Sequence, residues 1–241
     1  MNIFGKGDSF SIDNLEEGGA FLVDKDLDWT SFDVVNKLRF GIKRVLNKKK
    51  VKVGHAGTLD PRATGLLLVC CSKATKQINT LQDLGKEYTG TFYIGGTTPT
   101  YDTESEIDQN YPTDHINDID IHNATKDFFG DLSQIPPIFS AVKRNGVPMY
   151  KRARAGEDIK MAPRLITIQE FEITSIKMPE IEFRVVCSKG TYIRSLAYDF
   201  GKALGSGGYL QSLRRTKIGD YNVKNALSVI ELSDKIGTLH V

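Results

Sequence analysis

The sequence has 241 residues, of which 40% are hydrophobic and 26% charged, and its formal net charge is +2. This composition excludes a chain that is disordered over most of its length and is sufficient for a sizeable core. Three cysteines, two of them adjacent in the apolar run Leu66–Cys71, exclude a disulfide framework. That run is too short to cross a bilayer, and the first residues contain no apolar signal segment, so we expect a cytoplasmic protein.

The first part of the chain predicts a strand, a helix and a Gly-rich turn before a buried strand. After a polar leader, "AFLVDKD" begins a strand, and Thr30 or Ser31 begins a helix. The stretch "VGHAGTLDPRATGLLLVCC" at positions 53–71 then combines a polar turn with an apolar run. Helical spacing predicts that the buried face of the helix contains Phe32, Val35, Leu38 and Ile42.

The rest of the chain mixes strands and helices without regular alternation. "KEYTGTFYIGG" alternates as a strand does, and further strands are expected on either side of Met178-Pro179. Helices are expected over Asp118–Phe129 and roughly Ile193–Leu204. The basic stretch "QIPPIFSAVKRNGVPMYKRARAGEDIK" between them indicates a long excursion from the core. An α+β fold is therefore favoured over a doubly wound one.

Charge is unevenly distributed along the chain. Residues 41–52 contain six basic residues and no acid, whereas residues 102–127 contain eight acids and one lysine. A basic run raises the local affinity for polyanions, although it is also what a solvated surface looks like. We interpret the acidic run as solvated surface.

Several common kinds of site are absent from the sequence. No P-loop, dinucleotide fingerprint or serine-hydrolase elbow is present, and no His-x-x-x-His pair offers metal ligands. We therefore expect no cofactor and no metal. Asp60 is either a turn aspartate before Pro61 or a functional carboxylate. Tyr192 and Arg194, which share one face if extended, are either a base-stacking and carboxylate-pairing pair or a core tyrosine beside a surface arginine.

Five stretches together resemble the TruB family of tRNA pseudouridine synthases. In family order they are "GHAGTLDPRATGLL", "KEYTGTFYIGGTTPTYD", "QIPPIFSAVKRNGVPMYKRARAG", "CSKGTYIRSLAYDFGKALG" and "LRRTKIG". The chain departs from the family in an earlier loop, which usually reads D-K-P-x-G-x-[TS]-S. Here that loop is "DKDLDWTS", with Asp26 in place of the proline and Asp28 in place of the glycine.

The resemblance implies a mixed, mainly antiparallel central sheet flanked by helices, which is the pseudouridine synthase fold. It implies one catalytic domain over residues 1–241 with a thumb-like RNA-binding insertion around 130–165. Because the sequence ends soon after "LRRTKIG", we expect no C-terminal PUA domain. The family also suggests a monomer without an obligatory protein partner.

The resemblance further implies that the chain isomerises the T-arm uridine of tRNA, conventionally position 55, without a cofactor. Asp60 matches the catalytic carboxylate, Arg194 its partner, and Tyr88 the tyrosine that stacks on the base and is a candidate for removing the C5 proton. Because the base must be flipped out, another group should fill its place. The expected substrate-binding residues are His55, which fills that place, with Tyr192, Leu213 and Lys25. The expected phosphate contacts are Arg44, Lys48, Lys49, Lys50, Lys143, Arg152 and Arg154.

Two other functions stay open. A protein of the same architecture could bind or fold RNA without catalysis, and the presence of Asp60, Tyr88, Tyr192 and Arg194 speaks against that. A uridine isomerase acting on a different RNA is the second alternative.

Overall fold

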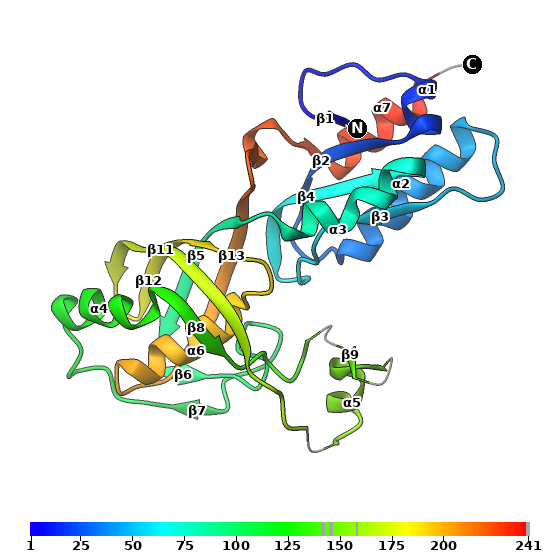
Figure 1. Ribbon diagram of the computed structural model, residues 1–241. Coiled ribbons are helices and arrows are strands. Elements are labelled where there is room, and N and C mark those ends of the chain that lie inside the picture. The colour runs from blue at the N-terminus through cyan, green and yellow to red at the C-terminus, as the bar shows by residue number, and fades with distance from the viewer. Residues whose placement is uncertain (141–142, 145–146, 158, 240–241) are drawn as a thin grey trace. The chain divides into compact units, whose positions relative to one another are not determined.

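A computed structural model describes residues 1–140, 143–144, 147–157 and 159–239 (Figure 1). The chain divides into two compact units, which we treat separately. Unit 1 contains Met1–Tyr88 and Arg214–Val241, and unit 2 contains Thr89–Leu213. No helix in the described ranges is long and apolar enough to span a membrane.

Within the described residues, eleven strands form one sheet, and their central order is β1-β2-β4-β13-β5-β12-β11-β8. Strands β3, β14 and β15 pair with β4, β13 and β2. Strands β1 and β15 run parallel to β2, whereas β2–β4, β3–β4, β8–β11, β11–β12 and β13–β14 are antiparallel. The predicted α+β fold with a mainly antiparallel sheet is confirmed.

Unit 1 contains both ends of the chain. Its strands are β1 (Asn2–Phe4), β2 (Gly19–Lys25), β3 (Val53–His55), β4 (Ala63–Cys71), β14 (Tyr221–Asn222) and β15 (Leu227–Ser228), with the start of β5 (Lys86–Ile94) and the end of β13 (Gly208–Ile218). Its helices are α1 (Ile12–Glu17), α2 (Ser31–Val45), α3 (Ile78–Asp83) and α7 (Val229–Gly237), with the 3-10 turns η1 (Ser72–Gln77) and η3 (Val223–Asn225). The polar leader of the sequence thus contributes the strand β1 and the helix α1.

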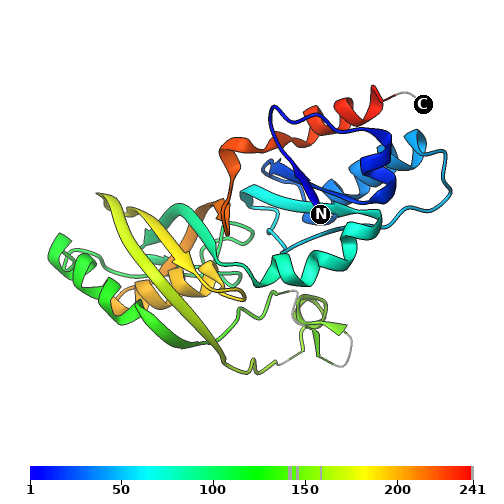
Figure 2. The ribbon, with the colours of Figure 1, turned by 45° about the horizontal axis from the view of Figure 1, so that its top comes forward.

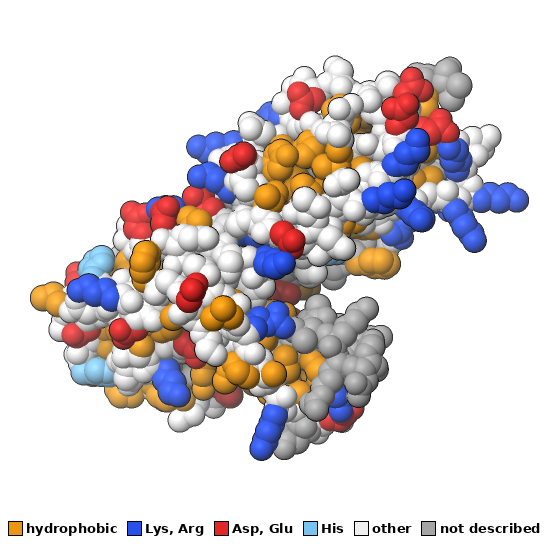
Figure 3. Space-filling model, in the orientation of Figure 1, with side chains coloured by type: hydrophobic (Ala, Val, Ile, Leu, Met, Phe, Trp, Pro, Cys, Tyr) orange, Lys and Arg blue, Asp and Glu red, His pale blue; other side chains and the backbone are white. Residues whose placement is uncertain are grey.

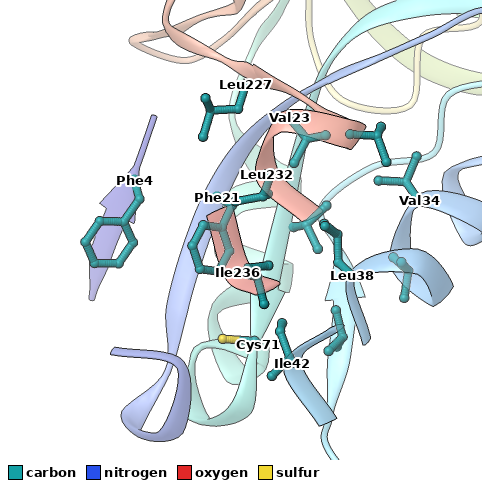
Figure 4. Close-up of a cluster of buried hydrophobic side chains, with 14 of the residues drawn as sticks. Phe4, Phe21, Val23, Val34, Leu38, Ile42, Cys71, Leu227, Leu232 and Ile236 are labelled. Atoms are coloured by element: carbon teal, nitrogen blue, oxygen red, sulfur yellow. The ribbon is translucent and has the colours of Figure 1, made fainter. Parts of the chain in front are cut away.

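Strands β2 and β4 are buried on both faces, which explains the continuous apolar run. One face packs against α2 and α7 through Phe21, Val23, Leu67 and Val69, as Figure 4 shows for several members of this cluster. The opposite face, with Leu22 and Leu68 among its members, packs against η1 and α3. All three cysteines are free and buried, as small apolar residues in such strands often are.

Helix α2 begins as the sequence predicts. Thr30 is its N-cap, and the hydroxyl of Thr30 accepts from the backbone N–H of Asp33, whose carboxylate in turn accepts from the backbone N–H of Thr30. This capping box is a common signal for a helix start. The expected buried face is wrong at one position, because Phe32 is 60% exposed and Val34 is buried in its place beside Val35. Periodicity alone does not distinguish these two faces.

Unit 2 contains the rest of the sheet. Its strands are β5, β6 (Gly96–Thr97), β7 (Gln109–Asn110), β8 (Gly130–Gln134), β9 (Lys143–Arg144), β10 (Val147–Pro148), β11 (Arg164–Lys177), β12 (Glu180–Cys187) and β13. Its helices are α4 (Asp118–Ala124), α5 (Met149–Arg154) and α6 (Ile193–Ala203), with the 3-10 turn η2 (Thr125–Phe128). The helix expected over Asp118–Phe129 is thus α4 followed by η2.

Helix α6 lies against the sheet of unit 2 (Figure 1, Figure 2). Aromatic rings form part of this packing. The ring of Phe200 lies 5.6 Å from that of Phe92 and 5.5 Å from that of Phe171, between ring centroids. Phe92 also stacks on Phe183 at 4.0 Å. This cluster holds α6, which contains Arg194, against the sheet.

Candidate active site

Asp60 lies on the turn between β3 and β4 and is half-buried. The turn is held at Leu59, whose backbone N–H donates to the hydroxyl of Ser31 at 2.8 Å while that hydroxyl donates to the Leu59 carbonyl at 3.0 Å. The backbone N–H of Ala63 donates to the Asp60 carbonyl at 3.0 Å. Because these bonds are mostly buried, the carboxylate is presented by a fixed backbone.

The loop that departs from the family is attached to the same turn. Asp28, in the glycine position, adopts the left-handed conformation with φ 64°, which aspartate tolerates better than most residues. Its backbone N–H donates to the Pro61 carbonyl at 2.9 Å, and its carboxylate pairs with Arg62 at 2.9 Å. The substituted residue therefore keeps the backbone geometry and adds a contact to the Asp60 turn.

Arg215, only 1% exposed, also binds the backbone around this turn. Its guanidinium donates to the carbonyls of Leu66, Gly57 and Thr58 at 2.7, 3.1 and 3.4 Å. These three carbonyls flank Asp60 on both sides. Strand β4 can approach this arginine because residue 65 is glycine, where φ is +105° and a Cβ atom would lie 2.3 Å from the Arg215 carbonyl oxygen.

Lys25 ends β2 and is fully buried. Its ammonium donates to the backbone carbonyls of Asp26 and Trp29 at 2.9 and 2.7 Å. Burial lowers the pKa of Lys25 to about 8, and the negative charge of Asp60 partly opposes that shift. Lys25 and Asp60 thus interact electrostatically, which brings together two of the predicted site residues.

His55, at the end of β3, belongs to the same group of residues. Burial lowers the pKa of its imidazole, and the positive charge of Arg215 lowers it further. The ring is therefore neutral at pH 7. A neutral, half-buried ring on this strand can stack on a base without adding charge to the site.

Tyr88 is buried in β5, and the motif that contains it has a clear local cause. Lys86 is buried two residues earlier. Its ammonium donates to the carbonyls of Gln82, in the last turn of α3, and of Leu84, directly after that helix, at 2.6 Å each. Glu87 accepts from Thr216 and Lys217 of β13. Both contacts fix the first residues of β5 and hence the place of Tyr88.

In unit 2, Arg194 is held by a buried carboxylate. It is 5% exposed, and its Nε lies 3.6 Å from Oδ2 of Asp102. Its Nη1 and Nη2 donate to the carbonyls of Thr100 and Phe139 at 3.1 and 3.0 Å. The interpretation of the acidic run as solvated surface is wrong at Asp102, which is 3% exposed. Arg194 is not a surface arginine either.

Tyr192 directly precedes α6 and is half-buried. Its backbone N–H donates to the side-chain carbonyl of Gln134 at 2.8 Å, and the amide of Gln134 donates to the Tyr192 carbonyl at 3.0 Å. The guanidinium of Arg164 lies 5.5 Å from the Tyr192 ring centroid. Tyr192 and Arg194 do not share a strand face, because the extended conformation stops at Tyr192 and Arg194 lies in the helix.

The predicted site residues therefore fall into two groups. Lys25, His55, Asp60 and Tyr88 belong to unit 1, and Tyr192, Arg194 and Leu213 belong to unit 2. Leu213 is half-buried in β13. The pairing of Asp60 with Arg194 remains a prediction.

Two family models match consecutive parts of the chain. One, described as TruB family pseudouridylate synthase (N terminal domain), matches residues 43–193, and the other, described as tRNA pseudouridylate synthase B C-terminal domain, matches residues 194–239. The chain belongs to the TruB family. The predicted resemblance is thereby confirmed.

Relatives and solved structures agree with this assignment. The tRNA pseudouridine synthase B of Flavobacterium johnsoniae is 63% identical over 214 residues, covering 88% of this chain and 93% of the relative. That of Phocaeicola vulgatus is 51% identical over 216 residues, covering 90% and 92%. A chain in a crystal structure of a Cbf5-Nop10-Gar1 complex is similar with a TM-score of 0.67 and 29% identity. The match covers 96% of this chain and 58% of that one, so the chain spans less than two thirds of the solved protein.

The basic residues expected to contact phosphate lie in two places. Arg44, Lys48, Lys49 and Lys50 are exposed at the end of α2 and in the loop after it. Arg152, in α5, pairs with Glu157 through Nε at 2.6 Å. The side chains of Lys143 and Arg154 lie outside the described residues.

Sequence reasoning missed three buried residues that contact predicted site residues or their turn within the same unit. Arg215 and Asp102 stand inside quoted motifs, "LRRTKIG" and "TTPTYD", but nothing local distinguishes them from surface charges. Gln134 is 5% exposed and lies two residues before the pair Pro136-Pro137, at the end of a strand. Nothing else in the sequence near Gln134 marks it as a structural residue. Within the described residues no group of three or more His, Cys, Asp or Glu side chains is arranged to hold a metal ion.

Proposed function

We propose that this TruB-family tRNA pseudouridine synthase isomerises the uridine of the tRNA T-arm, conventionally position 55, with Asp60 as its catalytic carboxylate. Its class as an isomerase rests on the family and on relatives that cover most of the chain. The choice of arm and the roles of individual residues are the proposal. The observation that supports it most directly is a half-buried aspartate on a turn whose backbone is hydrogen-bonded by both Ser31 and Arg215.

The chemistry needs one carboxylate and no transferred group. The bond from ribose to N1 breaks, the base rotates, C5 bonds to the ribose, the C5 proton leaves, and N1 takes up a proton. Asp60 acts on the nucleotide while its turn stays fixed, because rigid backbone hydrogen bonds hold a reacting group within the narrow range that catalysis requires. The buried ammonium of Lys25 interacts electrostatically with Asp60, which places a cation of the chain at the same turn.

The target base must leave its stack before Asp60 can reach it, which costs a few kcal/mol. His55, neutral at pH 7, fills the vacated place in the RNA. Tyr88 stacks on the flipped base and is the candidate for removing the C5 proton. Tyr192, Leu213 and Arg194 complete the pocket, with Arg194 pairing with Asp60.

The substrate is the T-arm stem-loop of tRNA, contacted along its phosphates by the basic residues of α2 and of the insertion around 130–165. We propose one catalytic domain over residues 1–241 that works as a monomer without an obligatory partner or cofactor. Because tRNA is modified where it is made, we place the enzyme in the cytoplasm.

The test is tritium release from C5-labelled uridine in an unmodified T-arm stem-loop, with purified protein and no added cofactor. We expect release by the wild type, loss of release in Asp60→Asn, and RNA binding by that variant within about twofold of wild type. Retained release in Asp60→Asn would exclude Asp60 as the catalytic carboxylate. Release from other RNA hairpins but not from the T-arm would reassign the substrate, and tight binding without release would favour the RNA-binding alternative.

A further inference from the structure

A surface hollow of about 470 Å³ lies at the end of α2 and does not include Asp60 among its lining residues. We call it the α2 hollow. Its walls are formed by Phe40, Lys43, Arg44, Asn47, Lys48 and Lys49. Figure 3 shows Lys and Arg side chains gathered over the end of α2 and the loop after it. The residues that form the walls include four cations and no carboxylate, so the hollow suits an anion.

Most of these cations are available to a ligand. Lys48 pairs with Glu16, but within the described residues Lys43, Arg44 and Lys49 form no ion pair. The loop turns sharply at Asn47, where φ is 47°, so the chain reverses beside the last turn of α2. Lysines on the loop thereby lie next to residues of the helix.

Phe40 adds an aromatic face to this positive surface. It is 72% exposed, the largest exposure of any phenylalanine among the described residues. A single exposed phenylalanine is unremarkable, and Phe32 on the same helix is 60% exposed. The difference is in their partners: the guanidinium of Arg39 lies 5.8 Å from the Phe32 ring centroid, whereas Phe40 has no ring contact within the described chain.

We propose that the α2 hollow binds an unpaired nucleotide of the RNA substrate, with its base stacked on Phe40 and its phosphates beside Lys43, Arg44 and Lys49. An aromatic ring beside several cations is the usual combination for binding an unstacked base together with its backbone. This inference rests on the proposed function for the identity of the RNA, and it adds a contact outside the catalytic turn. Phosphate contacts position an RNA, and a stacked base fixes its register.

The test is equilibrium binding of unmodified tRNA transcript at several salt concentrations, by wild type, Phe40→Ala, Phe40→Trp and Phe32→Ala. Loss of one stacked base should weaken binding by about 5- to 150-fold in Phe40→Ala, while Phe40→Trp and Phe32→Ala stay near wild type. The slope of log affinity against log salt should not change in Phe40→Ala, because phenylalanine carries no charge. In a Lys43→Gln, Lys49→Gln variant the slope should fall by about 1.5.

Tritium release measured in parallel separates this inference from the proposed function. If the wild type releases tritium and Phe40→Ala binds as tightly as Phe32→Ala, the α2 hollow is not an RNA site, and an acidic protein surface becomes its better occupant. The opposite result is that the wild type fails to release tritium, but Phe40→Ala still weakens RNA binding without changing the slope of log affinity against log salt. That result would support the α2 hollow as an RNA site and contradict the proposed catalysis.

Discussion

At the scale of single residues, Arg215 performs a task that its charge alone does not suggest. Its guanidinium binds three backbone carbonyls that flank Asp60. A guanidinium can do so because its donors are fixed in one plane and point in several directions. A lysine in the same place has one nitrogen and cannot reach carbonyls that lie on both sides of the turn.

We therefore expect Arg215→Lys to lower kcat by about 10- to 100-fold through misplacement of Asp60. The KM for T-arm RNA should change less than about twofold, since Arg215 is buried and cannot contact RNA. The measurement is steady-state tritium release well below the melting temperature of each variant. Arg214→Lys is the matched control, because Arg214 binds Asp24 at 2.6 and 3.0 Å and touches no carbonyl of the turn. Equal losses in both variants, or a loss confined to KM, would contradict the positioning role.

Lys25 makes stability depend on pH in a defined direction. Its pKa is about 8 in the folded protein against 10.5 in the unfolded chain. Between these values the unfolded chain binds the proton that the folded protein has released, so the free energy of unfolding rises with pH. Below pH 8 both states are protonated, and the burial of the charge is a constant cost.

We expect wild type to gain about 3 kcal/mol relative to Lys25→Met between pH 8 and pH 10.5, and nothing between pH 6 and pH 7.5. Urea unfolding of both proteins at each pH measures this difference. A difference that is flat across the upper range would mean that the buried ammonium keeps an ordinary pKa. If the stability of wild type relative to Lys25→Met instead falls between pH 8 and pH 10.5, the pKa of Lys25 is raised by folding.

At the scale of elements, the first turn of α2 serves two purposes through adjacent residues. Thr30 caps the helix, whereas Ser31 is hydrogen-bonded to Leu59, the residue before Asp60. Thr30→Ala should cost about 1 kcal/mol of stability and leave turnover intact. Ser31→Ala leaves a buried N–H and a buried carbonyl unsatisfied and should cost about 2 kcal/mol or more.

Ser31→Ala and Thr30→Ala should also differ in their rates of turnover. We expect Ser31→Ala to lower kcat for tritium release by about tenfold or more at a temperature where both variants are fully folded. Thr30→Ala should stay within about twofold of wild type. If Thr30→Ala loses as much kcat as Ser31→Ala, stability of α2 rather than the bond to Leu59 explains the loss.

Elements whose causes are local could be predicted from the sequence. The start of α2 at Thr30 or Ser31, the apolar run of β4 and the alternation in β5 each depend on neighbouring residues, and each was predicted. The misassigned face of Phe32 shows the limit of periodicity, since burial of Val34 depends on what covers the helix. The burial of Asp102 could not be predicted either, because it depends on Arg194, which lies 92 positions later in the chain. No local pattern encodes that contact.

At the scale of the whole molecule, the net charge of +2 conceals a strong separation of charge. The run over residues 41–52 has no acid, and Lys48, Lys49 and Lys50 are all exposed. RNA binding then depends on local charge and not on the total, because interactions between exposed charges fade beyond about 8 Å at physiological salt. A protein of nearly zero net charge can therefore show a steep salt dependence.

Neutralising Lys48, Lys49 and Lys50 together to glutamine should weaken RNA binding at low salt and flatten the plot of log affinity against log salt. If each lysine meets one phosphate, the slope should fall by about 2 to 3, since each phosphate contact contributes about 0.7 to 0.9. The control neutralises three exposed lysines elsewhere, Lys126, Lys177 and Lys202, and changes the net charge equally. Equal slopes in wild type and in the Lys48–Lys50 variant would make this run a solvated surface. If both triple variants lose the same amount of RNA affinity, total charge and not the local charge of Lys48, Lys49 and Lys50 determines binding.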